Sequence, residues 1–272
     1  MTLTTKQIQQ QFDGFLQTPC LWKNYDVFDL QQFQIQQKSQ PFNMQIDSKM
    51  RLGKYIERFV SFQLQQEKSV QLLAENIQIT KDKITLGELD CLLIKDEKPI
   101  HLEIIYKFYL YDSSVGNTEI EHFIGPNRKD SLIEKLNKLK SKQLPLLYTN
   151  ECKSYIDSLN LEVLGFEQQV YFKAQLFVPF TKKEVTLEAL NPECICGYYI
   201  NHQELKQFVD CKFYIPIKKD WLTMPHTNVD WLNLKIFKIE VNTFLERQFS
   251  PLVWMKHPSG NIEKLFVVWW HA

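Results

Sequence analysis

The sequence lacks long apolar runs, because no stretch approaches the roughly 18 consecutive apolar residues that a membrane-spanning helix needs. Its first residues, MTLTTKQIQQQFDGF, contain no basic segment followed by an apolar one, so no secretory signal is expected. Cysteine is sparse, with six residues among 272 positions. Only Cys194 and Cys196 lie close together, and one such pair does not indicate a zinc site. We therefore expect a reduced, cytoplasmic protein with no membrane contact.

An excess of charge of one sign is also missing. Lys and Arg total 32, Asp and Glu total 32, and the formal net charge is +0. This balance excludes a uniformly basic protein that coats nucleic acid, although a local basic face remains compatible with it. Hydrophobic residues make up 44% of the chain and charged residues 24%, so a folded core is expected.

The periodicity of apolar residues predicts a mixed α/β (α+β) fold. Leu52, Ile56 and Phe59 fall at helical steps of three and four. The polar turn at 95–98 separates two segments of strand-like composition. The predicted helices are 48–66, 128–142 and 228–248, and the predicted strands are 71–79, 85–94, 99–111, 144–149, 161–166, 168–180, 208–217, 220–225 and 262–270.

Charged residues interrupt the apolar strand 99–111. Period-two alternation puts Glu103 and Lys107 on the same face of this strand. A carboxylate and an ammonium are costly to bury there unless they are paired or bound to a metal. Asp90, in the neighbouring strand of the hairpin, brings a second carboxylate beside Glu103. Two converging carboxylates suit Mg²⁺ (or Mn²⁺), whose bound water can attack a phosphodiester.

These residues resemble the core of the PD-(D/E)XK nuclease superfamily. The string GELD at 87–90, followed by a turn and a strand that carries Glu103, matches its motif. The superfamily core is a helix, three strands, a helix and a further strand, which is the order predicted here. The resemblance implies that Asp90 and Glu103 hold Mg²⁺, that a lysine of the same strand is the catalytic cation, and that Glu57 assists.

One position departs from this motif. The usual lysine lies two residues after the glutamate, where this sequence has Ile105. Lys107 lies four residues after Glu103, on the same face but about 7 Å further along the strand than the usual lysine position.

A longer resemblance covers more of the chain. The segments GELDCLLI, HLEIIYKFYLY, HFIGPNRKDSLIEKLNKLKSKQLPL and FKAQLFVPF resemble the DUF1853 family, an uncharacterised and mainly bacterial family. The resemblance implies the same nuclease-like fold. This resemblance implies that a lysine at the position of Lys107, four residues after the glutamate, is typical of the family. We accordingly expect an N-terminal extension at 1–47 that packs on the core, a PD-(D/E)XK-like core at 48–180 and a C-terminal mixed α/β region at 181–272.

Other roles remain open for the acidic residues. Asp90 and Glu103 form an edge-strand ion pair with Lys107 in the simplest alternative. Glu88 shares the face of Asp90 and is a rival metal ligand. Glu57 is an ordinary solvated glutamate if no metal binds.

The predicted helix 128–142 is rich in basic residues. Arg128, Lys129 and Lys135 either contact the phosphate backbone of nucleic acid or belong to a solvated basic face. The sequence thus predicts a Mg²⁺-dependent nuclease that hydrolyses DNA phosphodiester bonds. The alternative is an inactive module of the same fold that binds nucleic acid or a protein partner. Nothing in the sequence indicates an oligomeric state.

Overall fold

The computed structural model describes residues 4–23, 26–182 and 184–270. Its contacts group the chain into two compact units, each built from separate segments. Unit 1 contains Met1–Pro19, Lys107–Ile133 and Ala174–Ala272, and unit 2 contains Cys20–Tyr106 and Glu134–Lys173. The predicted division into three consecutive regions (1–47, 48–180 and 181–272) stays a prediction.

Unit 2 is organised around three long antiparallel strands. Its elements are β1 (Gln31–Gln32), α2 (Leu52–Gln65), β2 (Val70–Lys81), β3 (Ile84–Lys95), the first part of β4 (Lys98–Tyr111), α4 (Asn150–Ser158) and the first part of β6 (Glu167–Pro179). Both hairpin turns are two residues long, and their central residues all have positive φ, which suits the right-handed twist of the strands. The order of the long strands is β2-β3-β4-β6.

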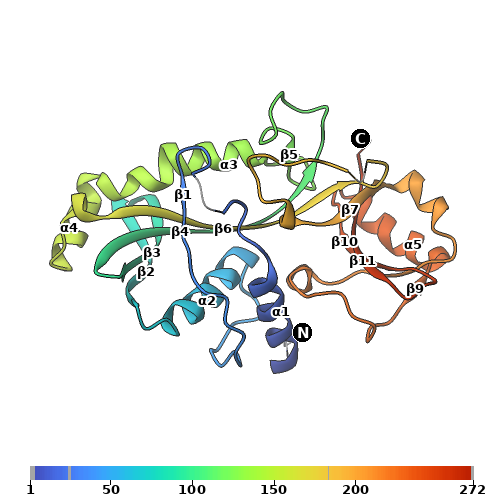
Figure 1. Cartoon of the computed structure of the whole chain (residues 1–272), viewed down its shortest axis with the longest axis horizontal. Coiled ribbons are helices and arrows are strands. Elements are labelled where there is room, and N and C mark those ends of the chain that lie inside the picture. The colour runs from blue at the N-terminus through green and yellow to red at the C-terminus, as the bar shows by residue number, and fades with distance from the viewer. Residues whose placement is uncertain (1–3, 24–25, 183, 271–272) are drawn as a thin grey trace. The chain divides into compact units, whose positions relative to one another are not determined.

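The core of unit 2 lies on both faces of these strands. On one face, Ile77 and Leu89 pack with Leu147 and with Ile156 of α4. Helix α2 covers the other face (Figure 1), and its buried side includes Tyr55. The functional residues predicted on β3 and β4 therefore belong to a helix-covered sheet.

Unit 1 holds the remaining elements. These are α1 (Thr5–Gln17), β5 (Phe123–Ile124), β7 (Ile195–Asn201), β8 (Lys212–Tyr214), β9 (Leu232–Asn233), α5 (Leu234–Leu245), β10 (Leu252–Lys256) and β11 (Ile262–Val268), together with the later parts of β4 and β6. The strand order is β6-β7-β11-β10-β8-β9. Helix α5 lies against this sheet (Figure 1), where Phe237 stacks on Phe213 with ring centroids 4.2 Å apart.

The predicted mixed α/β class is confirmed, and the predicted helix 228–248 appears as the shorter α5. The strand predicted at 144–149 is wrong, because Leu144–Tyr148 forms a 3-10 helix with Pro145 in its first turn. The strand predicted at 161–166 is also wrong, since Val163–Gly165 forms another 3-10 turn. A third wrong strand is 220–225, which begins at the end of the 3-10 helix Lys218–Trp221.

The helix predicted over 128–142 is shorter than expected. It occupies Leu132–Lys138 (α3) and continues as a π-helical turn over Leu139–Gln143. A turn precedes it, in which the Arg128 N–H donates to the Gly125 carbonyl at 2.8 Å and Arg128 has a φ of 55°. Arg128 and Lys129 therefore lie before the helix. No helix among the described residues is long and apolar enough to cross a bilayer.

Candidate functional site

Three carboxylates of unit 2 meet where α2 packs against the β2–β3 hairpin. Glu57 projects from α2, whereas Glu88 and Asp90 lie two residues apart on β3 and so share one face of the strand. One oxygen from each carboxylate lies within 4.8 Å of the others. All three residues are partly buried. We call Glu57, Glu88 and Asp90 the acidic cluster.

A lysine of α2 lies against the acidic cluster. Lys54 Nζ is 2.9 Å from Glu57 Oε2 and also pairs with Glu88 Oε1. The same ammonium donates to Asn76 Oδ1 on β2 at 2.5 Å. Partial burial acts to lower the pKa of Lys54, but the hydrogen bonds to Glu88 and Glu57 outweigh it and raise the pKa. Lys54 is therefore a charged ammonium near neutral pH, and it offsets part of the negative charge.

Asp90 is the most perturbed carboxyl of the acidic cluster. Burial and the nearby charge of Glu103 raise its pKa from 3.8 to about 7. The Ile104 N–H donates to Asp90 Oδ2 at 2.9 Å, which favours the ionised form but does not reverse the shift. Burial also raises the pKa of Glu57, because it outweighs the contact with Lys54. At both Asp90 and Glu57, burial and the neighbouring carboxylates thus outweigh the stabilisation that Lys54 gives to the ionised form.

Glu103 lies next to this cluster, inside unit 2. The last β3–β4 pair is Cys91 with Leu102, so Asp90 and Glu103 stand one step beyond it. Glu103 is fully buried. Gln143 Nε2 donates to Glu103 Oε2 at 2.5 Å. The other oxygen, Oε1, lies 3.3 Å from His101 Nε2 but makes no hydrogen bond with a described residue. A buried carboxylate oxygen without such a partner is costly, and it is an available ligand atom.

The lysine predicted as the catalytic cation lies in the other unit. The division falls between Tyr106 and Lys107, so β4 carries Glu103 in unit 2 and Lys107 in unit 1. Within unit 1, Lys107 Nζ pairs with Asp130 Oδ2 at 2.5 Å.

The three basic residues predicted to contact nucleic acid also differ in their surroundings. Arg128 pairs with Asp112 at 2.8 Å and stacks over Trp270, both in unit 1. Lys129 is exposed. Lys135 belongs to unit 2, where it donates to Gln143 Oε1 at 2.7 Å. Arg128 and Lys135 thus have partners within the fold.

Comparison with known proteins supplies a family for this chain. The model of a domain of unknown function (DUF1853) matches residues 10–268. The chain belongs to the DUF1853 family. No curated protein and no solved structure matches it. The DUF1853 match runs through both compact units, so the acidic cluster and Lys107 both fall within the family's domain.

Three neighbours of the carboxylates were not singled out by sequence reasoning. Lys54 stands three residues before Glu57 on the same helical face, a spacing that could have drawn attention to it. Asn76 and Gln143 gave no comparable signal, because a bulged strand and a π-helical turn position them.

Proposed function

We propose that this DUF1853 protein is a metal-dependent phosphodiesterase that acts on DNA. The observation that carries the proposal is the acidic cluster of Glu57, Glu88 and Asp90, with the Lys54 ammonium beside it. Carboxylates that converge beside a cation are the groups that phosphodiester hydrolysis uses. The resemblance of GELD and Glu103 to the PD-(D/E)XK motif supports the same reading.

The residues of the site fit a hard divalent cation. The acidic cluster and Glu103 offer oxygen ligands only, which are preferred by Mg²⁺ and Mn²⁺. Glu103 adds a buried oxygen with no hydrogen-bond partner among the described residues. Asp90, Glu88 and Glu57 would hold the ion, and Glu103 is a further carboxylate close enough to Asp90 to interact with it. Such an ion supplies a nucleophilic water and a positive charge for the phosphate.

In this proposal, the side chains around the metal site have separate roles. Glu57 orients Lys54 through the 2.9 Å contact, so that the ammonium can face the negative charge that develops on the phosphate. Gln143 fixes one oxygen of Glu103 and so limits its rotation. Burial of Glu103, and partial burial of Asp90, lowers the local dielectric constant and so strengthens the charge interactions of these two carboxylates.

The decisive experiment compares two lysine variants. Single-stranded, duplex and branched DNA are incubated with the protein and Mg²⁺ or Mn²⁺, and cleavage is measured for wild type, Asp90→Ala, Lys54→Met and Lys107→Met. We expect cleavage to disappear in Asp90→Ala. Lys54→Met should lower the rate by a factor on the order of 10²–10³, as for the loss of one charge-stabilising donor. Loss in Lys107→Met with retention in Lys54→Met would assign the catalytic cation to Lys107 instead.

The matched control is Glu162→Gln, which alters an exposed carboxylate of unit 2 outside the acidic cluster. It should cleave like wild type. Cleavage that survives in Asp90→Ala would refute the assignment. Calorimetric titration with Mn²⁺ provides a separate readout, in which wild type binds and Asp90→Ala does not.

The Lys54 contacts also support a second function. An ammonium that already pairs with two members of the acidic cluster can act as its permanent counter-ion. The protein would then be an inactive module that binds nucleic acid or a protein partner. The same titration separates the two functions, because this module would neither bind Mn²⁺ nor cleave DNA.

A further inference from the structure

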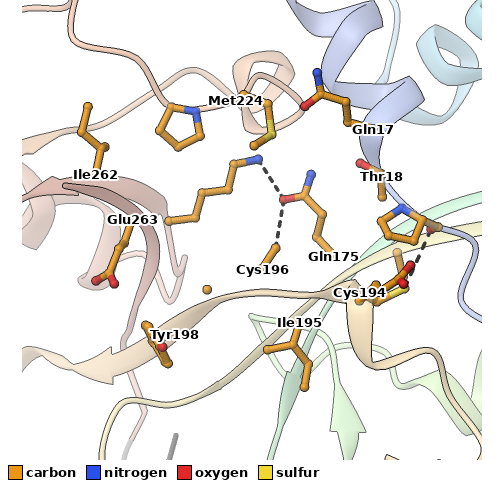
Figure 2. Close-up of a pocket in the computed structure, with 16 residues that line it drawn as sticks. Gln17, Thr18, Gln175, Cys194, Ile195, Cys196, Tyr198, Met224, Ile262 and Glu263 are labelled. Carbon is orange, nitrogen blue, oxygen red and sulfur yellow. Dashed lines mark hydrogen bonds between the residues drawn. The ribbon is translucent and has the colours of Figure 1, made fainter.

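Unit 1 contains a pocket whose lining residues all belong to that unit and include no member of the acidic cluster. Its volume is about 490 Å³, within the range of sites for small organic molecules. The end of α1, strands β6, β7 and β11, and residues near Met224 surround it (Figure 2). The polar groups that meet there include Gln175, Cys196 and Lys264.

Lys264 lies in the interior of the sheet. Its strand, β11, is flanked by β7 and β10, and the side chain is only 4% exposed. The opposite face of β11 carries Leu265 and Val267, which pack in the core with Phe237 of α5. Gly197 on β7 allows the strands to approach here, because a Cβ at this position would lie 2.3 Å from the Lys264 carbonyl oxygen.

The Lys264 nitrogen has two neutral acceptors. It donates to Gln175 Oε1 at 2.9 Å and to the Trp221 carbonyl at 2.7 Å. Within the described ranges no carboxylate pairs with it. Two acceptors satisfy both N–H bonds of a neutral amine and leave its lone pair unused, whereas an ammonium would keep a third N–H without an acceptor.

The electrostatic surroundings favour the same neutral form. Burial lowers the pKa of Lys264 to about 8, and the nearby Cys196 thiol offsets only part of this shift. About one molecule in ten therefore carries a neutral amine at pH 7, compared with about one in 2,500 for an exposed lysine. A neutral amine at the wall of a pocket is a nucleophile.

We propose that this pocket binds a small uncharged aldehyde or ketone and that Lys264 forms an imine with it. Besides Lys264, the charged residues at the pocket are Glu193, which is exposed, and Glu263, which lies on the opposite face of β11 and pairs with His257 at 2.8 Å. No second cation is therefore present at the pocket, and the Glu193 carboxylate disfavours a phosphate or another multiply charged anion, since like charges repel. The apolar lining, which includes Met224 and Pro225, suits an uncharged organic molecule.

The chemistry needs no further reagent. The Lys264 lone pair attacks the carbonyl carbon, and the carbon–oxygen π electrons move to the oxygen. One proton passes from nitrogen to that oxygen to give a carbinolamine. The carbinolamine then loses water as the carbon–nitrogen double bond forms. One carbonyl and one amine thus give one imine and one water, with no change of oxidation state.

Reductive labelling with propanal tests the proposal. Full-length protein is treated with propanal and cyanoborohydride, which reduces the imine to a stable propylamine, and labelled peptides are quantified by mass spectrometry. The internal control is Lys142, an exposed lysine of unit 2. At pH 7 the neutral fraction of Lys264 predicts labelling on the order of 200-fold faster than for an ordinary exposed lysine, and Lys142 serves as the exposed reference. Its rate should be half-maximal near pH 8.

The concentration dependence tests the pocket itself. The labelling rate of Lys264 should saturate with propanal, because binding precedes reaction, whereas that of Lys142 should rise linearly. Two variants add to this test. Lys264→Arg should lose the label, and Gln175→Glu should raise the pH midpoint by at least one unit, because a carboxylate then faces the ammonium.

Three results would overturn the proposal, and all use the wild-type protein. The first is labelling of Lys264 no faster than that of Lys142 at pH 7. The second is a rate that stays linear in propanal concentration. The third is protection of Lys264 by inorganic phosphate, which would show that the pocket takes an anion instead of an uncharged carbonyl compound.

Discussion

Replacing Asp90 with Asn should stabilise the metal-free protein, and the gain should grow with pH. The Asp90 carboxyl is buried beside Glu103, and its pKa is raised to about 7 in the folded protein. In the unfolded chain its pKa returns to about 3.9. The folded state therefore binds more protons between about pH 4 and pH 7. Asp90 makes its full contribution to stability below this window and loses it as the pH rises through 7.

The size of the effect follows from the same pKa change. Each pKa unit corresponds to about 1.4 kcal/mol, so ionising Asp90 in the folded protein costs up to about 4 kcal/mol above pH 8. About 1.5 kcal/mol of this cost is already present at pH 5. Asn keeps an oxygen that accepts from the Ile104 N–H but carries no charge. The stability gain of Asp90→Asn should thus be about 2–3 kcal/mol larger at pH 8 than at pH 5.

Urea unfolding in EDTA at pH 5 and pH 8 measures this difference. The control Glu162→Gln, at an exposed position, should show no comparable change between the two pH values. A gain that is equal at both pH values, or a loss of stability at pH 8, would refute the reasoning. Either result would mean that Asp90 is ionised in the folded protein without a large cost.

Three further predictions concern packing and buried polarity, and urea unfolding measures each. Gln143→Ala should destabilise the protein by about 1–3 kcal/mol, because it removes the donor to the buried Glu103 carboxylate; equal stability would show that water replaces the amide. Phe237→Ala should cost about 3–5 kcal/mol, since the ring is fully buried in a stacked pair, and a loss under 1 kcal/mol would contradict this packing. Gly197→Ala should cost about 1–3 kcal/mol, because its Cβ would meet the Lys264 carbonyl; a neutral result would mean that the strands move apart.

The sequence predicted the hairpins of unit 2 well, because their signals are local. Along each strand, apolar and polar residues alternate or apolar residues form a long run. Polar pairs such as Asp96 and Glu97 form the turns. This local information also put Asp90 in the strand next to that of Glu103. The even spacing of Glu88 and Asp90 correctly indicated a shared face.

Features that depend on packing were not predictable in this way. The position of Lys54 depends on how α2 docks against β2 and β3, which no spacing within the helix specifies. Helix α4 was missed because only Cys152 and Ile156 of its residues are buried, too few for a visible apolar stripe. The segment 144–149 is as apolar as a strand, but it forms a 3-10 helix with Pro145 in its first turn and buries three leucines from that helix.

The position of Lys107 shows a second property that the alternation of residues along a strand does not predict. Alternation along a strand identifies a shared face, but it does not identify which compact unit a residue belongs to. Strand β4 is long enough to serve two units, so Glu103 and Lys107 occupy different ones despite their even spacing. A strand of ordinary length would have kept them together.

The interleaving of the two units has a consequence for synthesis on the ribosome. Unit 2 is complete once Lys173 has emerged, whereas unit 1 must wait for the last hundred residues. Helix α1 is made early, yet Gln11 pairs with Asp220 at 2.6 Å and Gly14 lies against Leu222. The apolar face of α1 therefore stays without these neighbours while about two hundred further residues are added. Factors that bind nascent apolar helices should matter more for unit 1 than for unit 2.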